Sequence, residues 1–240
     1  MTDLTLFQPP TRPWNTPNLS PFCIKLECYL RMAEIPYKTA AMQISKAPKG
    51  KIPYVALPDG TLMGDSQLII EHLERTLVAG GKLALDAGLS ASDLAIARLT
   101  RRALEEGYYF VSIYLRWKTD EGFAAMRDAF KKFVPGIIVP LVRRGIRKKL
   151  HGQGTGRHTF EEAMGLGASD FDACAELLGD RPFLLGDKPR TVDCTLFAFL
   201  DGVLGFPVDS PVKARVLSHA NLVAYRQRIR DRWWKDLDKA

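Results

Sequence analysis

The spacing of apolar residues changes near residue 80, and this change limits the fold more than any other feature of the chain. Before it, short apolar runs alternate with helical patterns, whereas after Ser90 the spacing is almost entirely helical. Gly80 and Gly81 lie between the two regions. We therefore predict an α+β domain over residues 1–80, followed by an all-α domain over residues 88–240.

The first region predicts the order strand, helix, strand, loop, strand, strand, helix. An apolar run at residues 4–9 indicates a buried strand, and a helix is expected to begin after the N-cap Ser20 and to end near Glu34. A Pro-Asp-Gly turn at residues 58–60 separates two short apolar runs, which is typical of a hairpin. Ser66 is expected to cap the helix that follows.

The second region predicts a long helix that starts with a capping box at Ser90 and continues to Trp117. Five further helices are expected at residues 122–133, 140–150, 159–178, 192–204 and 221–234.

Composition is that of an ordinary globular protein, with 46% hydrophobic and 25% charged residues. No apolar run approaches the roughly 20 residues of a transmembrane helix. The N-terminus lacks the basic and apolar stretches of a signal peptide, so we expect no transmembrane segment and a cytoplasmic location. The four cysteines lack metal-ligand spacing, which predicts reduced, mostly buried thiols and no metal.

The formal net charge of +7 is concentrated in residues 143–158, which hold six basic residues and no acid. Such a stretch can bind nucleic acid, an anionic membrane or an acidic partner. No nucleic-acid motif or array of stacking aromatic residues accompanies it. We expect a solvated surface and no nucleic-acid partner.

Three stretches of the first region offer groups for chemistry. Ser20 begins a helix, where free N–H groups and the helix dipole stabilise an anion, although a simple N-cap is an equal alternative. Pro53 follows Ile52 at the start of a strand and is either an ordinary trans proline or a cis proline that exposes the Ile52 backbone to an extended ligand. Asp65 and Ser66 precede a helix and either cap it or also bind the charged ends of a ligand.

Taken in this order, the stretches "SPFCIKLECYLRMAEIPY", "GKIPYV" and "GDSQLIIEHLE" resemble the thioredoxin-like half of a glutathione transferase. Further along, "LEEGYYFVSIYLRW", "RPFLLGDKPRTVDCTLFAFLDGVL" and "NLVAYRQRIRDRWW" resemble the failed axon connections and metaxin-like branch of that superfamily, especially its bacterial members. The resemblance covers nearly the whole chain. It implies a thioredoxin-like N-terminal domain, an all-helical C-terminal domain and a homodimer.

The resemblance also implies a role for each candidate residue. Ser20 faces the glutathione sulfur, and its hydroxyl donates a hydrogen bond that favours the thiolate. The glutathione backbone pairs at Ile52 and Pro53, its γ-glutamyl group binds at Asp65 and Ser66, and its glycyl carboxylate meets Lys51 or Lys49. Aromatic residues of the long helix are expected to offer a second-substrate surface, namely Tyr108, Tyr109 and Trp117.

The leading functional hypothesis is a glutathione transferase that acts on a small hydrophobic electrophile. One alternative is a non-catalytic, metaxin-like interaction protein. Another is a glutathione-dependent thiol oxidoreductase that uses Cys23, which we otherwise expect to be a small buried side chain. Lys25 is expected to assist only if its side chain turns toward the site.

Overall fold

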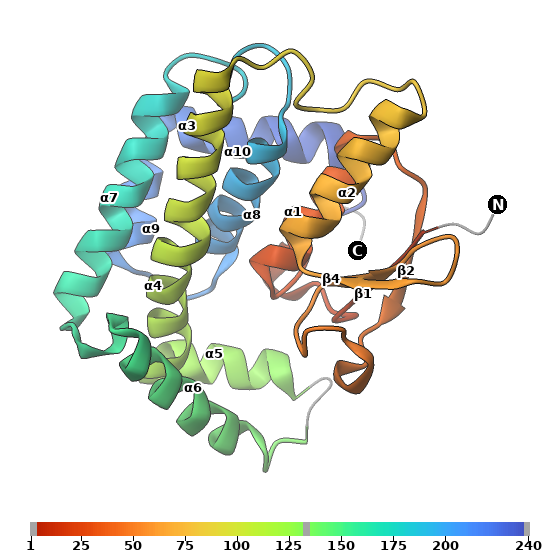
Figure 1. The fold of residues 1–240 in the computed structure, drawn as a ribbon. Coiled ribbons are helices and arrows are strands. Elements are labelled where there is room, and N and C mark those ends of the chain that lie inside the picture. The colour runs from red at the N-terminus through yellow and green to blue at the C-terminus, as the bar shows by residue number, and fades with distance from the viewer. Residues whose placement is uncertain (1–3, 132–134, 238–240) are drawn as a thin grey trace.

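A computed structural model describes residues 4–131 and 135–237. Its N-terminal part consists of four strands, two α-helices and two short 3-10 turns (Figure 1). These elements are β1 (Leu4–Gln8), η1 (Pro13–Asn15), α1 (Pro21–Met32), β2 (Tyr37–Ala41), η2 (Ile44–Lys46), β3 (Tyr54–Ala56), β4 (Leu62–Gly64) and α2 (Ser66–Ala79). The predicted order of strands and helices is confirmed.

The four strands form one mixed sheet in the order β2-β1-β3-β4. β1 pairs with β2 in parallel and with β3 in antiparallel orientation, so Leu6 lies opposite Val55. β3 and β4 form the predicted hairpin, in which Gly60 has a φ of 85° that glycine adopts readily. Leu6 and Val55 are fully buried, because α1 and α2 lie over this part of the sheet.

The C-terminal part is entirely helical, as predicted. Its elements are α3 (Ala91–Arg102), η3 (Ala103–Tyr108), α4 (Tyr109–Ile113), η4 (Tyr114–Lys118), α5 (Asp120–Phe130), α6 (Val139–Gln153), η5 (Thr155–Arg157), α7 (Phe160–Leu178), α8 (Thr191–Gly205), α9 (Pro211–Ser218) and α10 (Ala220–Trp233). The predicted end of one helix at Phe133 lies outside the described residues. The sequence analysis missed α9, a helix of only eight residues.

The predicted long helix is a continuous rod from Ala91 to Lys118 that contains two π-helical segments, η3 and η4. π segments widen the helix by one residue per turn and are common near functional sites. α7 lies along one side of this rod, while α8 lies between the rod and α1 (Figure 1).

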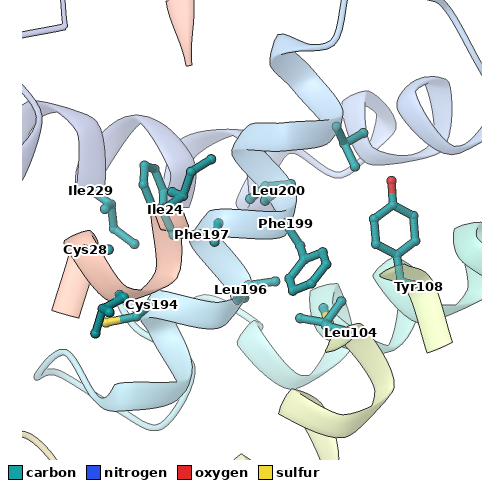
Figure 2. Close-up of a cluster of buried hydrophobic side chains, with 14 of the residues drawn as sticks. Ile24, Cys28, Leu104, Tyr108, Cys194, Leu196, Phe197, Phe199, Leu200 and Ile229 are labelled. Atoms are coloured by element: carbon teal, nitrogen blue, oxygen red, sulfur yellow. The ribbon is translucent and has the colours of Figure 1, made fainter. Parts of the chain in front are cut away.

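The two parts of the chain meet where α1 packs along α8. Figure 2 shows Ile24 and Cys28 of α1 beside the apolar side chains of α8, including Phe197 and Leu200. All four of these side chains are at most 1% exposed. Because burial of apolar surface is the main favourable term in folding, this shared core fixes the start of α1 against the helical part.

α1 has no solvated polar face over its central turns. Lys25 and Glu27 are fully buried or nearly so. Lys25 Nζ lies 2.6 Å from Oε1 of Glu105, and Glu27 Oε1 lies 3.0 Å from Nη2 of Arg31. The charges are tolerated inside because each has an ionic partner.

Candidate active site

Ser20 directly precedes α1, with Pro21 as the first helical residue. Ser20 has extended backbone angles and occupies the N-cap position, as predicted, but its side chain does not cap a backbone N–H group. Its half-buried hydroxyl is instead a hydrogen-bond neighbour of the Cys23 thiol. The hydroxyl is therefore not committed to holding the helix together.

The loop between β1 and Ser20 is held by buried polar groups. Asn18 Oδ1 accepts a hydrogen bond from the Ser20 N–H at 3.2 Å, and Asn18 Nδ2 donates to the Pro9 carbonyl at 3.0 Å. From the helical part, Arg116 donates to the carbonyl of Leu19 at 2.9 Å. These bonds fix the backbone on which Ser20 stands.

Arg116 is a site residue that the sequence analysis missed. It is 8% exposed and lies on η4, and its guanidinium sits over the ring of Phe206 at 5.3 Å. The one available signal was a lone arginine between Leu115 and Trp117 in a strongly apolar stretch. Such a residue usually snorkels to solvent, so sequence alone gave no reason to place it beside Ser20.

Cys23 lies in the first turn of α1 and is fully buried. Burial raises the pKa of its thiol to about 12, and neighbouring Glu27 acts in the same direction. The Ser20 hydroxyl lowers this pKa but does not offset the burial. Since the thiolate is the reactive form, a role as nucleophile is disfavoured.

The Ile52–Pro53 peptide is cis. It directly precedes β3, with Pro53 buried and Ile52 half-buried. Lys51 and Lys49 are both exposed in the preceding loop.

Asp65 and Ser66 lie at the start of α2, but their structural roles differ from the prediction. Asp65, not Ser66, is the N-cap, since its Oδ1 accepts hydrogen bonds from the N–H groups of Gln67 at 3.0 Å and Leu68 at 3.2 Å. Ser66 is the first helical residue and is buried. Asp65 has a φ of 85°, which costs free energy for a side chain with a Cβ and is typical of functional turns.

Strand register brings these candidate residues to one edge of the sheet. Tyr54 pairs with Gly64, so the flanking residues Pro53 and Asp65 are neighbours across the hairpin. Phe7, near the end of β1, pairs with the same Tyr54.

A further bond links the two helices at this edge. Lys25 Nζ of α1 donates to Gln67 Oε1 of α2 at 2.7 Å. This bond ties the second turn of α1 to the first turn of α2.

The three predicted substrate-facing aromatic residues differ in burial. Tyr108 is 5% and Trp117 3% exposed. Tyr108 packs edge-on against Phe171 with ring centroids 4.7 Å apart, and Figure 2 shows it near Phe199 in the core. Both side chains thus form part of the helical core rather than an open surface.

Tyr109 is half-buried and makes an edge contact with Phe22, the second residue of α1, at a centroid distance of 5.0 Å. Of the three aromatic residues, it combines partial exposure with a position near Ser20.

The basic stretch contributes one structural residue. Arg143 donates to the carbonyls of Trp117, Lys118 and Thr119 at the end of η4. Its neighbours Arg144, Arg147, Lys148 and Lys149 are exposed.

Within residues 4–131 and 135–237, no helix is long and apolar enough to cross a membrane, and no group of three or more His, Cys, Asp or Glu side chains is placed to hold a metal ion.

Comparison with known families gives matches over both parts of the chain. Residues 21–122 match the glutathione S-transferase N-terminal domain, and residues 167–229 match the glutathione S-transferase C-terminal domain. Isoprene-epoxide–glutathione S-transferase of Rhodococcus sp. (strain AD45) is 34% identical over 237 residues, covering 92% of this chain and 95% of the relative.

Failed axon connections of Drosophila melanogaster is 28% identical over 240 residues, covering 93% of this chain and 56% of the relative. Among solved structures, glutathione S-transferase III in its apo form superposes with a TM-score of 0.65 at 16% identity, covering 100% of this chain and 97% of that one, which supports the fold alone. The expected thioredoxin-like half and helical half are both confirmed. From its family matches and its full-length relative, the chain belongs to the glutathione S-transferase family of enzymes.

Proposed function

We propose that this chain joins the sulfur of glutathione to a carbon of a small hydrophobic electrophile. One observation carries the proposal. The Ser20 hydroxyl begins a buried helix without capping it, and Lys25 of that helix donates a hydrogen bond to Gln67 of α2, the helix that begins at the edge where Pro53 and Asp65 meet. A hydroxyl in that position can donate a hydrogen bond to a sulfur anion at the positive end of α1.

Glutathione would lie along this edge with each of its polar groups near a complementary one. The backbone of Ile52, directly before Pro53 and β3, would pair with the cysteinyl residue of glutathione. Asp65 would accept from the γ-glutamyl ammonium, while Ser66 would donate to the adjacent carboxylate. Lys51, which is exposed, would attract the glycyl carboxylate.

The proposed reaction requires the protein to stabilise a thiolate. The bound thiol releases its proton to water, and Ser20 stabilises the thiolate that remains. The sulfur electron pair then forms a bond to the electrophilic carbon, and the electrons of the broken bond leave with the departing group. For an epoxide, that group is the ring oxygen, which takes a proton from water.

Small epoxides are the first electrophiles to test, because the 34% identical relative is named for isoprene epoxide. Tyr109 would form part of the surface that such an apolar substrate meets, beside Phe22. The Tyr109–Phe22 contact is aromatic, which suits an apolar substrate.

We also propose a division into domains at residues 1–80 and 88–240, a homodimer in solution and a cytoplasmic location. Light scattering on the purified protein tests the dimer, and cell fractionation tests the location.

Titration calorimetry with glutathione is the direct test of the proposed function. We expect binding at millimolar concentrations or below, weakened about tenfold or more in Asp65→Ala because a charge-assisted contact is lost. Asp59→Ala is a matched control, since Asp59 is an exposed turn aspartate whose Oδ1 accepts from the Thr61 N–H. Absence of glutathione binding at millimolar concentration in the wild type would refute the proposal.

A further inference from the structure

Arg116 carries a buried positive charge that no carboxylate of the described chain neutralises. Burial lowers the pKa of the Arg116 guanidinium. The ionisable groups that interact with it are the phenols of Tyr108 and Tyr109. Arginine nevertheless stays protonated in proteins. Since buried charges are normally paired, an unpaired guanidinium at 8% exposure calls for an anion that the protein itself does not supply.

Arg230 provides an internal comparison, because it has nearly the same exposure and a similar contact. It is 7% exposed, and its Nη2 donates to the carbonyl of Asn15 in the loop before Ser20 at 2.9 Å. Its charge, however, faces the fully buried Asp201 at 3.3 Å. An arginine that binds the loop before Ser20 can therefore also have an ionic partner, as Arg230 does.

The unpaired charge lies beside the backbone that leads into Ser20. Arg116 Nη1 is 2.9 Å from the carbonyl oxygen of Leu19, the residue directly before Ser20. The other buried cation near this edge, Lys25, is already matched by Glu105 at 2.6 Å. Of these two cations, Arg116 is the one without a carboxylate partner in the described chain, so its charge is available to a ligand.

We propose that Arg116 is a positioning residue whose uncompensated charge stabilises the anionic sulfur of bound glutathione. This inference rests on the proposed function. Arg116 acts in two ways: it fixes the Leu19–Ser20 peptide that orients the serine hydroxyl, and its charge favours the thiolate once the thiol proton has passed to water. The nearby Cys23 thiol does not compete for that charge, because its raised pKa keeps it neutral.

Two substitutions separate charge from hydrogen bonding. Arg116→Gln keeps a donor for the Leu19 carbonyl and removes the charge, whereas Arg116→Lys keeps the charge. Arg230→Gln is the matched control. Each variant is tested for the pKa of bound glutathione, followed through the ultraviolet absorbance of the thiolate, and for calorimetric affinity toward glutathione sulfonate and S-methylglutathione.

The charge role predicts that Arg116→Gln raises the thiol pKa by about one unit and weakens the sulfonate about tenfold relative to the S-methyl compound. Arg116→Lys is expected to stay close to the wild type in both, and Arg230→Gln to change neither, even if it lowers Tm. An unchanged pKa and sulfonate preference in Arg116→Gln would overturn the inference, as would an equal change in Arg230→Gln.

Failure of the proposed function would give a different result from failure of the inference about Arg116. In that case the wild type would not bind glutathione or would leave its thiol pKa unshifted. Where binding occurs without a shifted pKa, the preference for the sulfonate still decides whether Arg116 supplies a charge to the sulfur position.

Discussion

Breaking the buried ion pair between Lys25 and Glu105 is expected to destabilise the protein unequally from its two sides. The side chains are 1% and 8% exposed, and the pair joins α1 to the rod of the helical part. Glu105 has a second cation, because Arg101 Nη1 lies 3.0 Å from its other oxygen. Within the part of the chain that the structure describes, the other hydrogen-bond partner of Lys25 is the neutral Gln67.

The loss in the free energy of unfolding depends on which buried charge loses its ionic partner. Glu105→Gln leaves a buried ammonium without an anion, which costs about 3–5 kcal/mol of the free energy of unfolding. Lys25→Met keeps the apolar stem and leaves Glu105 paired with Arg101, so the cost is nearer 1–2 kcal/mol, about that of the lost hydrogen bonds. The double variant is expected to resemble Lys25→Met alone, because its buried ammonium is gone.

The dependence on pH gives a second check. Burial lowers the pKa of Lys25 in the folded state below its ordinary value of 10.5. The unfolded chain therefore binds more protons than the folded one as pH approaches that value, and stability rises with pH there. In Glu105→Gln the opposing effect of the carboxylate is absent, so this rise is expected to be steeper.

Urea denaturation followed by circular dichroism measures these differences. Glu106→Gln is the control, since Glu106 pairs with Arg102 one residue further along the same rod and both side chains are 52% exposed. That change is expected to cost less than about 1 kcal/mol. If Glu105→Gln cost no more than Glu106→Gln, the reasoning about the buried pair would be refuted.

Three further predictions concern single side chains. Burial raises the pKa of the Asp170 carboxyl to about 6, so ionisation weakens the fold as pH rises from about 4 to 6; burial raises the pKa of Asp193 to about 6 as well, so Asp170→Asn is expected to reduce that decline in Tm, and a decline of unchanged size would contradict it. Tyr109→Ala is expected to raise KM for the electrophile with little change in stability, whereas Tyr108→Ala, in the core, is expected to cost about 3–5 kcal/mol in urea denaturation; equal effects on KM and stability would argue against this division. Native Cys23 is expected to resist iodoacetamide, measured by mass spectrometry, and Cys23→Ala to retain turnover; rapid alkylation would instead support an oxidoreductase.

Local patterns were sufficient to predict the order of strands and helices in the first region and all but α9 of the α-helical regions in the second. Alternating and helical periodicities report which faces are apolar, and the Pro-Asp-Gly turn reports a reversal of the chain. The cis peptide at Pro53 could be anticipated only through the family resemblance, because a strand-initial proline alone is compatible with trans.

Charged residues explain most of what the sequence did not predict. Lys25 and Glu27 have the spacing of a solvated helix face, but their partners include Glu105, which is 80 residues away in the chain. Arg116 was overlooked because its contact, the carbonyl of Leu19, is 97 residues away in the chain. A periodic pattern records side-chain polarity and says nothing of a distant partner that makes burial tolerable.

The exchange of roles between Asp65 and Ser66 has a more local cause. Both residue types are good N-caps, so the sequence leaves the helix start uncertain by one residue. The structure resolves this through the positive φ of Asp65, a conformation that side-chain preferences do not predict.

Stabilisation of the glutathione thiolate by the Ser20 hydroxyl is tested by measuring kcat/KM of Ser20→Ala across pH. A hydrogen bond to a charged group contributes about 1.5–3 kcal/mol, so kcat/KM at neutral pH is expected to fall about 10- to 100-fold. The apparent pKa of the profile should rise, while the calorimetric Kd for glutathione changes little. A Ser20→Ala variant with the kcat/KM and pH profile of the wild type would contradict the account.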